Sequence, residues 1–250
     1  MRVCALVERR AAGHRGATLA AALDLLPALG VSAVPWYVDA GAVRLDRPAL
    51  EADLYLSVTP SPLALSLATG LETLGARVLN RAGATLLARD ASRSAAVLTR
   101  AGLPVPQTIA AARPEPLAPL LAAGPLLLRP HGSEDHETAI RSPDDLPAAG
   151  DEPQVLVAHR LPPAARPSRL VVIGDDVFAA EAGRAPPVLP RLADLARRCG
   201  RALGLELYAV EVAETDAEPL VLAVDPFPDF AGVPDPARRL AEYVARAGSA

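Results

Sequence analysis

Two acidic side chains, Glu211 and Asp225, have the types and the spacing that most directly suggest chemistry. They lie in residues 205–230, where alternating apolar residues predict two strands separated by a polar turn at 215–219. Because successive side chains of a strand point to opposite faces, a suitable hairpin register would place the two carboxylates side by side. Such a pair suits Mg²⁺, which proteins usually hold by one or two carboxylates plus phosphate oxygens. The alternative is that both are solvent-facing charges on a hairpin, because paired carboxylates are often only structural.

The composition excludes several classes of function. The chain has 250 residues, of which 51% are hydrophobic but only 3% aromatic, so Leu, Val and Ala must build the core. All 25 basic residues are arginine, and the absence of lysine excludes a P-loop, whose motif requires one. A net charge of −4 provides no overall basic surface, which argues against non-specific nucleic-acid binding.

The two cysteines and the apolar stretches indicate the compartment. Cys4 and Cys199 lie far apart in apolar patterns, so we expect buried thiols in a reducing compartment and neither a disulfide nor a metal site. The first residues form too short an apolar run for a signal peptide. The longest uncharged stretch, 54–71, carries Pro60 and Pro62 and is a poor membrane helix. We therefore expect a cytoplasmic protein with no membrane partner.

The first part of the chain alternates apolar strand and helix patterns, which predicts a parallel sheet covered by helices. We expect strands at 2–7, 31–38 and 54–58, and helices at 18–29 and 62–74. Gly13 and Gly16 lie where a phosphate-binding turn could form, but the first glycine of a dinucleotide fingerprint is missing. We interpret both as loop residues.

The most specific pattern lies between Leu79 and Thr108. It contains Leu79-Asn80, then Asp90 near the start of a helix, Leu98, and a Gly-x-Pro-x-Pro-x-Thr run from Gly102 to Thr108. This pattern resembles the ATP-grasp superfamily, particularly its RimK-like carboxylate–amine ligases, and the order of the later elements fits over nearly the whole chain. The resemblance implies an α/β (α+β) ATP-grasp fold with an N-terminal Rossmann-like pre-ATP-grasp domain. It also implies three parts: the N-terminal domain at 1–81, a central nucleotide-lid region at 82–157 and a C-terminal ATP-grasp sheet domain at 158–250.

The resemblance implies roles for three arginines. Arg129 takes the place of the family's second nucleotide-binding lysine, and Arg93 takes the place of the first when the alignment slips by two residues. Arg169 matches an arginine that faces the substrate or the transferred phosphate, and it is the implied catalytic residue. Arginine binds phosphate well, often through two hydrogen bonds, but its planar head group is not a geometric equivalent of lysine. For each of the three the alternative is an ordinary exposed charge.

The implied nucleotide site also includes Ser133, His159 and Leu161. Ser133 falls where the family has a flexible glycine-rich loop over the phosphates, whereas His159 and Leu161 fall in the strand and linker that contact adenine and ribose. In this chain the loop segment, 131–137, holds one glycine and three acidic residues, which would repel a triphosphate unless they bind a cation.

The metal ligands that the resemblance implies are reduced in number. Glu211 stands where the family usually has aspartate, Asp225 stands where it has asparagine, and Ala223 replaces its main metal-binding glutamate. The two remaining carboxylates are compatible with Mg²⁺ that is held mainly by phosphate oxygens.

Two functions follow as expectations. In the first, the protein is an ATP- and Mg²⁺-dependent ligase that joins a carboxylate to an amine through an acylphosphate, with small-molecule or peptide substrates. In the second, it is a catalytically degenerate ATP-grasp scaffold that binds a nucleotide or a partner. The sequence leaves a homo-oligomer or a protein partner open.

Overall fold

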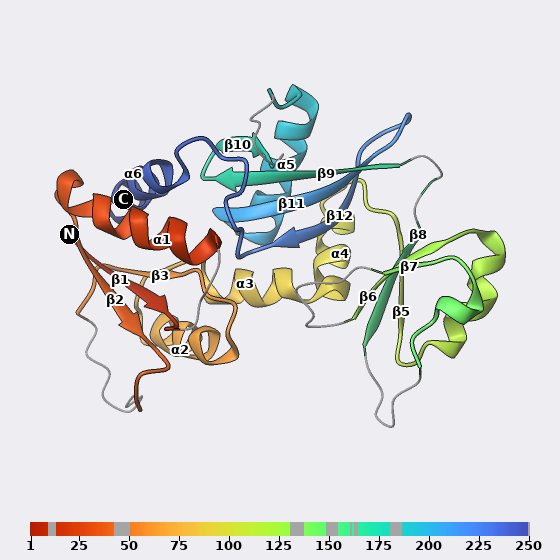
Figure 1. Cartoon of the computed structure of the whole chain (residues 1–250), viewed down its shortest axis with the longest axis horizontal. Helices are drawn as coiled ribbons and strands as arrows, with labels where there is room; N and C mark the ends of the chain where they lie inside the picture. The colour runs from red at the N-terminus through yellow and green to blue at the C-terminus, as the bar shows by residue number, and fades with distance from the viewer. Residues whose placement is uncertain are drawn as a thin grey trace.

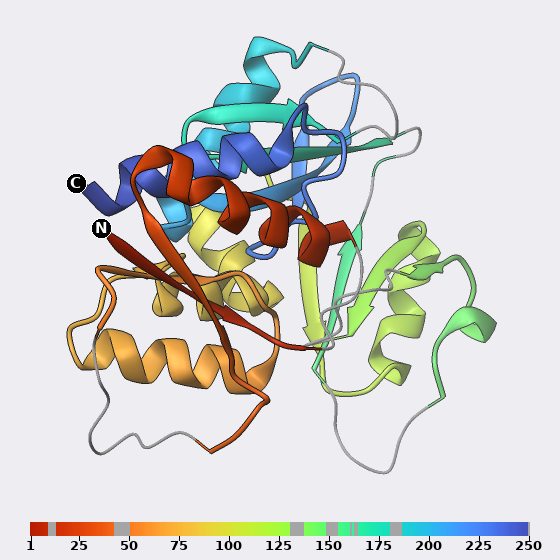
Figure 2. The same cartoon turned by 60° about the vertical axis from the view of Figure 1, so that its left-hand side comes forward.

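A computed structural model describes residues 1–9, 14–42, 51–130, 138–148, 155–160, 162, 165–180 and 187–249. The described residues form three four-stranded sheets, which follow one another along the chain. The central sheet lies to one side of the other two, and the two chain ends lie together on the opposite side (Figures 1 and 2).

The N-terminal sheet is parallel, as the alternating pattern predicts, and its strand order is β2-β1-β3-β4. Its strands are β1 (Arg2–Val7), β2 (Ser32–Tyr37), β3 (Leu54–Ser57) and β4 (Val78–Leu79). The helices between them are α1 (His14–Leu25) with the 3-10 turn η1 (Leu26–Leu29), and α2 (Pro62–Thr73). The η1 turn ends at Gly30, whose φ of 74° is a left-handed conformation that glycine adopts without strain. Ser61 begins α2 by accepting a hydrogen bond from the Ala64 N–H, and Pro62 occupies the first helical position.

The central sheet is antiparallel, with the strand order β5-β8-β6-β7. Its strands are β5 (Gln107–Ala111), β6 (Leu126–Pro130), β7 (Thr138–Ile140) and β8 (Leu156–Arg160). Alternate residues such as Leu126, Leu128 and Leu156 pack under the 3-10 segment η2 (Glu115–Ala123), and η3 (Pro143–Asp145) follows β7. Arg129 and His159 belong to the alternate set of positions and therefore lie on the opposite face of the sheet.

The C-terminal sheet is antiparallel, with the order β10-β9-β11-β12. Its strands are β9 (Arg166–Ile173), β10 (Asp176–Ala179), β11 (Leu207–Glu214) and β12 (Leu220–Asp225). One face packs against α3 (Ala82–Arg89), α4 (Ala91–Arg100) and α5 (Pro190–Leu203). The other face packs against α1, α6 (Pro236–Ser249) and the N-terminal sheet (Figure 1). The first and third sheets therefore share one core, whereas the central sheet has its own.

The shared core is tied together by Asn80, which is fully buried directly after β4. Its side-chain oxygen accepts hydrogen bonds from the Glu206 and Leu207 N–H groups, both at 2.9 Å. Its side-chain nitrogen donates to the carbonyls of Leu207 (2.5 Å) and Pro226 (3.3 Å). One amide thus fixes the end of the N-terminal sheet against the beginning of β11 and the end of β12.

The part boundaries inferred from the sequence can now be compared with the strands. The boundary after residue 157 would fall inside β8, which pairs along its length with both β5 and β6. We propose that the central region extends to Arg160, because splitting a paired strand between two domains would break its ladder.

Both cysteines are free thiols, as expected. Cys199 is fully buried and Cys4 is half-buried; burial raises the pKa of both, to about 12 for Cys199. In the described part of the chain, no helix combines the length and the apolar character needed to cross a membrane.

Candidate functional site

Four charged side chains from two sheets form one cluster. Arg129 on β6 donates to Glu211 on β11 at 2.8 Å. Arg169 on β9 donates to the other Glu211 oxygen at 2.9 Å and to Asp225 at the end of β12 at 2.8 Å. These four side chains are 23–31% exposed and so lie at a partly buried surface. We call them the Arg–carboxylate cluster.

The strand register explains why three of these residues meet. Glu211 lies directly opposite Arg169 on one neighbouring strand and opposite Ala223 on the other. Asp225 lies two residues beyond Ala223 and therefore emerges from the same face. The predicted convergence of Glu211 and Asp225 is confirmed, because a single guanidinium binds both.

The electrostatics of the cluster hold Arg169 firmly in its charged form. Burial acts to lower the pKa of Arg169, but the charge and hydrogen bond of Asp225, together with the charges of Glu211 and Asp229, outweigh it. The net effect raises the pKa of Arg169 above its ordinary value. Arg169 therefore acts as a permanent cation fixed between two carboxylates.

His159 presents an unpartnered acceptor on the same side of the central sheet as Arg129. Its Nδ1 lies 3.0 Å from the Thr108 hydroxyl, which donates its proton to the Pro106 carbonyl at 3.0 Å. Because the Thr108 hydroxyl uses its only proton in that bond, it must accept a hydrogen bond from His159. We therefore assign the ring proton of His159 to Nδ1, which leaves Nε2 as an acceptor. Nε2 is buried and has no hydrogen-bond partner among the described residues. Burial, and to a lesser degree the charge of Arg129, lower the pKa of His159 to about 4, so the imidazole is neutral near pH 7.

The other residues of the predicted site do not join the cluster. Arg93 lies in the first turn of α4, where its N–H donates to the capping carboxylate of Asp90 at 3.0 Å. Its side chain is exposed, and within the described residues no hydrogen bond or ion pair connects it to the cluster. Ser133 and Leu161, and the acidic segment 131–137, lie outside the described residues.

The cluster fits a divalent cation only in part. Among the described residues, no group of three or more His, Cys, Asp or Glu side chains could hold a metal ion. Glu211 and Asp225 are two suitable oxygen ligands, but both are engaged by guanidinium groups, and the neighbouring Ala223 supplies none. A bound Mg²⁺ would therefore need phosphate oxygens to complete its ligands.

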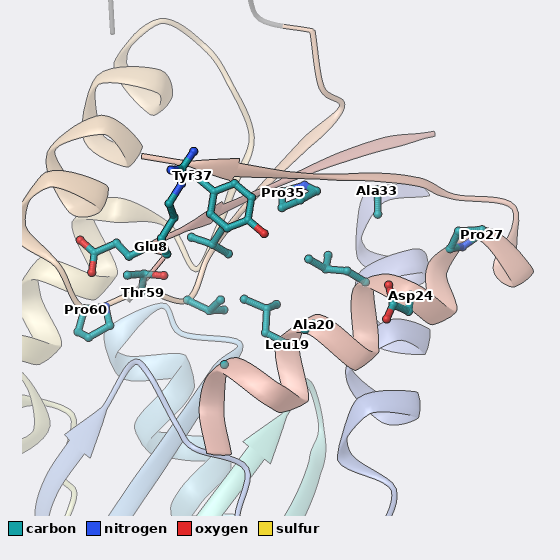
Figure 3. A pocket seen from close by; sticks show the side chains of 15 residues that line it. Glu8, Leu19, Ala20, Asp24, Pro27, Ala33, Pro35, Tyr37, Thr59 and Pro60 are labelled. Atoms are coloured by element: carbon teal, nitrogen blue, oxygen red, sulfur yellow. The ribbon is translucent and has the colours of Figure 1, made fainter. Parts of the chain in front are cut away.

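Some features of the site were not predicted from the sequence. The sequence indicates Thr108 only as part of a motif, whereas its register position opposite His159 explains their contact. Asp229 was not singled out. A pocket in the N-terminal part was also missed, although Glu8 directly follows β1 and Thr59 lies two residues beyond β3, and the carboxyl ends of such strands commonly border ligand sites (Figure 3).

The chain resembles several known proteins. A probable alpha-L-glutamate ligase of Citrobacter koseri is 27% identical in an alignment of 208 residues, and the match covers 70% of this chain and 69% of that protein. The crystal structure of a RimK domain ATP-grasp protein from Sphaerobacter thermophilus has a TM-score of 0.75 and 25% identity, and the match covers 98% of this chain and 99% of that one. The ATP-grasp ligase PsnB, in complex with a phosphomimetic variant of its minimal precursor, Mg and ADP, has a TM-score of 0.73 and 16% identity over 99% of this chain and 98% of that one. No family model matches the sequence.

The three-sheet architecture is that of an ATP-grasp protein. Within that superfamily the chain resembles the RimK-like type, because it is 25% identical to a RimK domain protein over nearly its full length and 27% identical to a probable alpha-L-glutamate ligase over 70% of its length. The resemblance inferred from residues 79–108 and the predicted fold class are both confirmed.

Proposed function

We propose that the protein is an ATP-dependent ligase that joins a carboxylate to an amine through an acylphosphate. The observation that carries the proposal is the convergence of Arg129 and Arg169, which come from different sheets and bind the same carboxylate. Two guanidinium groups this close together suit phosphate groups, which accept paired hydrogen bonds from arginine. The likeness to a glutamate ligase, and to PsnB, which also forms a complex with a precursor peptide, supports small-molecule or peptide substrates.

The open face of the central sheet supplies the rest of the nucleotide site in this proposal. The Nε2 of His159 lacks a donor, and the exocyclic amino group of adenine is a donor of the required kind. Arg129 lies near enough to His159 to lower its pKa, so one ligand could reach both residues with its base and its phosphates. The proposed nucleotide contacts also include Arg93, Ser133 and Leu161.

ATP binding requires an exchange of partners within the cluster. The phosphates compete with Glu211 and Asp225 for the two guanidinium groups, because each arginine has a limited set of donors. The carboxylates released in this way would hold Mg²⁺ together with phosphate oxygens. When bound, Mg²⁺ neutralises negative charge on the phosphates during transfer.

The reaction then depends more on the positioning of the reactants by the protein than on covalent catalysis by its side chains. The γ-phosphoryl group passes from ATP to a carboxylate oxygen of the substrate, and ADP leaves. The amine nitrogen attacks the acyl carbon, the bond to the phosphate oxygen breaks, and the amine loses a proton. Arg169 would hold the transferred phosphoryl group, since the neighbouring carboxylates keep its charge permanent.

The acylphosphate can be tested without knowing the natural amine. Hydroxylamine converts an acylphosphate to a hydroxamate, so the purified protein would be incubated with ATP, Mg²⁺, hydroxylamine and a panel of amino acids and short peptides. We expect at least one carboxylate to yield hydroxamate and ADP in equal amounts. The combined Glu211→Gln and Asp225→Asn variant should abolish this turnover, whereas Glu214→Gln, which changes a carboxylate further along β11, should not. Unchanged hydroxamate formation in the double variant would contradict the assigned site. ATP binding without activation of any carboxylate would favour the scaffold function.

A cytoplasmic location is part of this proposal, because an ATP-dependent ligase must act where ATP is available.

A further inference from the structure

A pocket of about 640 Å³ lies in the N-terminal part, between α1 and the sheet (Figure 3). It borders Val7 and Glu8 at the carboxyl end of β1, and Val58 and Thr59 after β3. The chain leaves β1 toward β2 on one side, and β3 lies on the other side, so this is the point where the strand order reverses. Ligands of open α/β sheets bind outside the carboxyl ends of strands at such a point, and the volume is typical of a small-molecule site.

The walls of the pocket are largely apolar. They are formed by one face of α1 and by residues of β2 and the strand ends, among them Leu19, Ala20, Leu23, Pro27, Ala33 and Pro35. The Tyr37 ring projects over this apolar surface (Figure 3). A ligand that fills the pocket therefore has an apolar body.

The charges of the lining favour a cation. Glu8 and Asp24 lie at opposite ends of the pocket (Figure 3), and within the described residues neither carboxylate has an ion-pair or hydrogen-bond partner. The only described basic residue of the lining, Arg9, places its guanidinium over the Tyr37 ring at 5.8 Å. The described residues of the lining thus have an excess of negative charge, and their acidic groups are available to a ligand.

A chain of contacts connects the Glu8 end of the pocket to the Arg–carboxylate cluster. The carbonyl of Pro60, in the pocket wall, accepts a hydrogen bond from Arg89 at 2.6 Å. The Arg89 guanidinium lies 5.9 Å from the centre of the Phe227 ring, and the Phe227 N–H donates to Asp225 at 2.8 Å. Arg89 and Phe227 therefore link the wall of the pocket at Pro60 to Asp225 of the cluster.

We propose that this pocket binds the amine substrate of the ligase, a primary amine on an apolar body, with its ammonium group at Glu8 and its body along α1. The role of this amine as a substrate rests on the proposed ligase function. The binding of an apolar amine at this place stands on the pocket alone. Asp24, at the far end, contributes less than Glu8, because it lies on an exposed part of α1.

Binding is tested by titrating the isotope-labelled protein with isoamylamine and, as an uncharged ligand of the same size, isoamyl alcohol, while recording amide chemical shifts. We expect roughly millimolar affinity for the amine, as is usual for so small a ligand, with shifts confined to the lining of the pocket. The alcohol should bind at least several-fold more weakly. Glu8→Gln should weaken amine binding roughly tenfold, since it removes a charge-assisted contact. Glu218→Gln, in the turn between β11 and β12, should not change it.

A substitution that fills the pocket tests whether the amine binds there and not elsewhere on the molecule. Ala20 and Ala21 are both exposed on α1, but only Ala20 lines the pocket. Ala20→Phe should abolish amine binding, and Ala21→Phe should leave it intact; both should still bind ATP like the wild-type protein. Equal binding of amine and alcohol, or amine binding that survives Ala20→Phe, would overturn the inference. A wild-type protein that binds the amine in the pocket but no ATP would refute the ligase proposal while leaving the amine site in place.

Discussion

At the scale of single residues, the charged groups of the Arg–carboxylate cluster share their hydrogen-bond partners. Glu211 has both of its oxygens occupied by arginines, and Arg169 is shared between Glu211 and Asp225. Removing one member of such a partly buried group leaves its partners without compensation, so the effects of substitution will not be additive. The two arginines are paired with carboxylates when ATP is absent, and the phosphates of ATP must displace these carboxylates. The strength of the ion pairs therefore helps to set the affinity for ATP.

The lowered pKa of His159 predicts how the free energy of unfolding depends on pH. Its pKa is lowered to about 4 in the folded protein and is near 6.5 when unfolded, so the unfolded state takes up a proton first as the pH falls. The stability that His159 contributes is fully present above pH 6.5 and is lost as the pH falls from there toward 4. Between about pH 7 and pH 5 this loss should reach about 2 kcal/mol.

The measurement is the free energy of unfolding by denaturant at a series of pH values. His159→Gln, which retains polarity but does not titrate in this range, should flatten the decline even if the variant is less stable overall. Parallel pH profiles for the two proteins would show that His159 is not held neutral.

At the scale of elements, strand alternation and close helix–sheet packing decide where the functional side chains lie. The α5 helix packs so closely on the C-terminal sheet that the Tyr208 hydroxyl reaches the Ala196 carbonyl at 2.9 Å. A Cβ at Gly200 would overlap the Tyr208 hydroxyl and ring, so glycine at this position permits the close approach. This packing supports the strand that carries Glu211.

Gly200→Ala should therefore destabilise the protein by about 1–3 kcal/mol, the usual effect of overpacking a core. Gly70→Ala in α2 is the matched control, because among the described residues no atom outside the neighbouring residues and the backbone of its own helix lies within 4 Å of the added methyl group. It should stabilise the protein by about 0.5–1 kcal/mol through the better helix propensity of alanine. Denaturant unfolding measures both, and equal effects of the two substitutions would contradict the packing argument.

The elements were largely predictable from the sequence, because apolar periodicity is a local property. The strands around 2–7 and 54–58, the helix around 62–74, and the hairpin of Glu211 and Asp225 all follow from such patterns. The pairing of Arg129 with Glu211 was not predictable, because the two residues are 82 positions apart and belong to different sheets. The pocket was missed because its walls are ordinary apolar side chains; only the position of Glu8 after a parallel strand could have indicated it.

At the scale of the whole molecule, the central sheet has a core of its own, and the Arg129–Glu211 ion pair joins it to the body that the other two sheets form. The N-terminal and C-terminal sheets share one core and are joined by the buried amide of Asn80. The proposed amine pocket therefore lies in the part of the molecule that also carries Arg169 and Asp225, whereas the proposed nucleotide contacts of His159 and Arg129 lie on the central sheet. ATP bound between the two bodies would bring all the reactants together.

The most direct test of this account is a calorimetric titration of ATP into the purified protein, with and without Mg²⁺. We predict micromolar binding that Mg²⁺ strengthens. Arg169→Met should weaken it at least tenfold, because a charge-assisted contact to phosphate is lost. Arg166→Met, on the opposite face of the same strand, should bind ATP like the wild-type protein. Equal effects of the two arginine variants would contradict the role assigned to Arg169. The absence of binding at millimolar ATP would contradict the account as a whole and would mean that the fold serves as a scaffold.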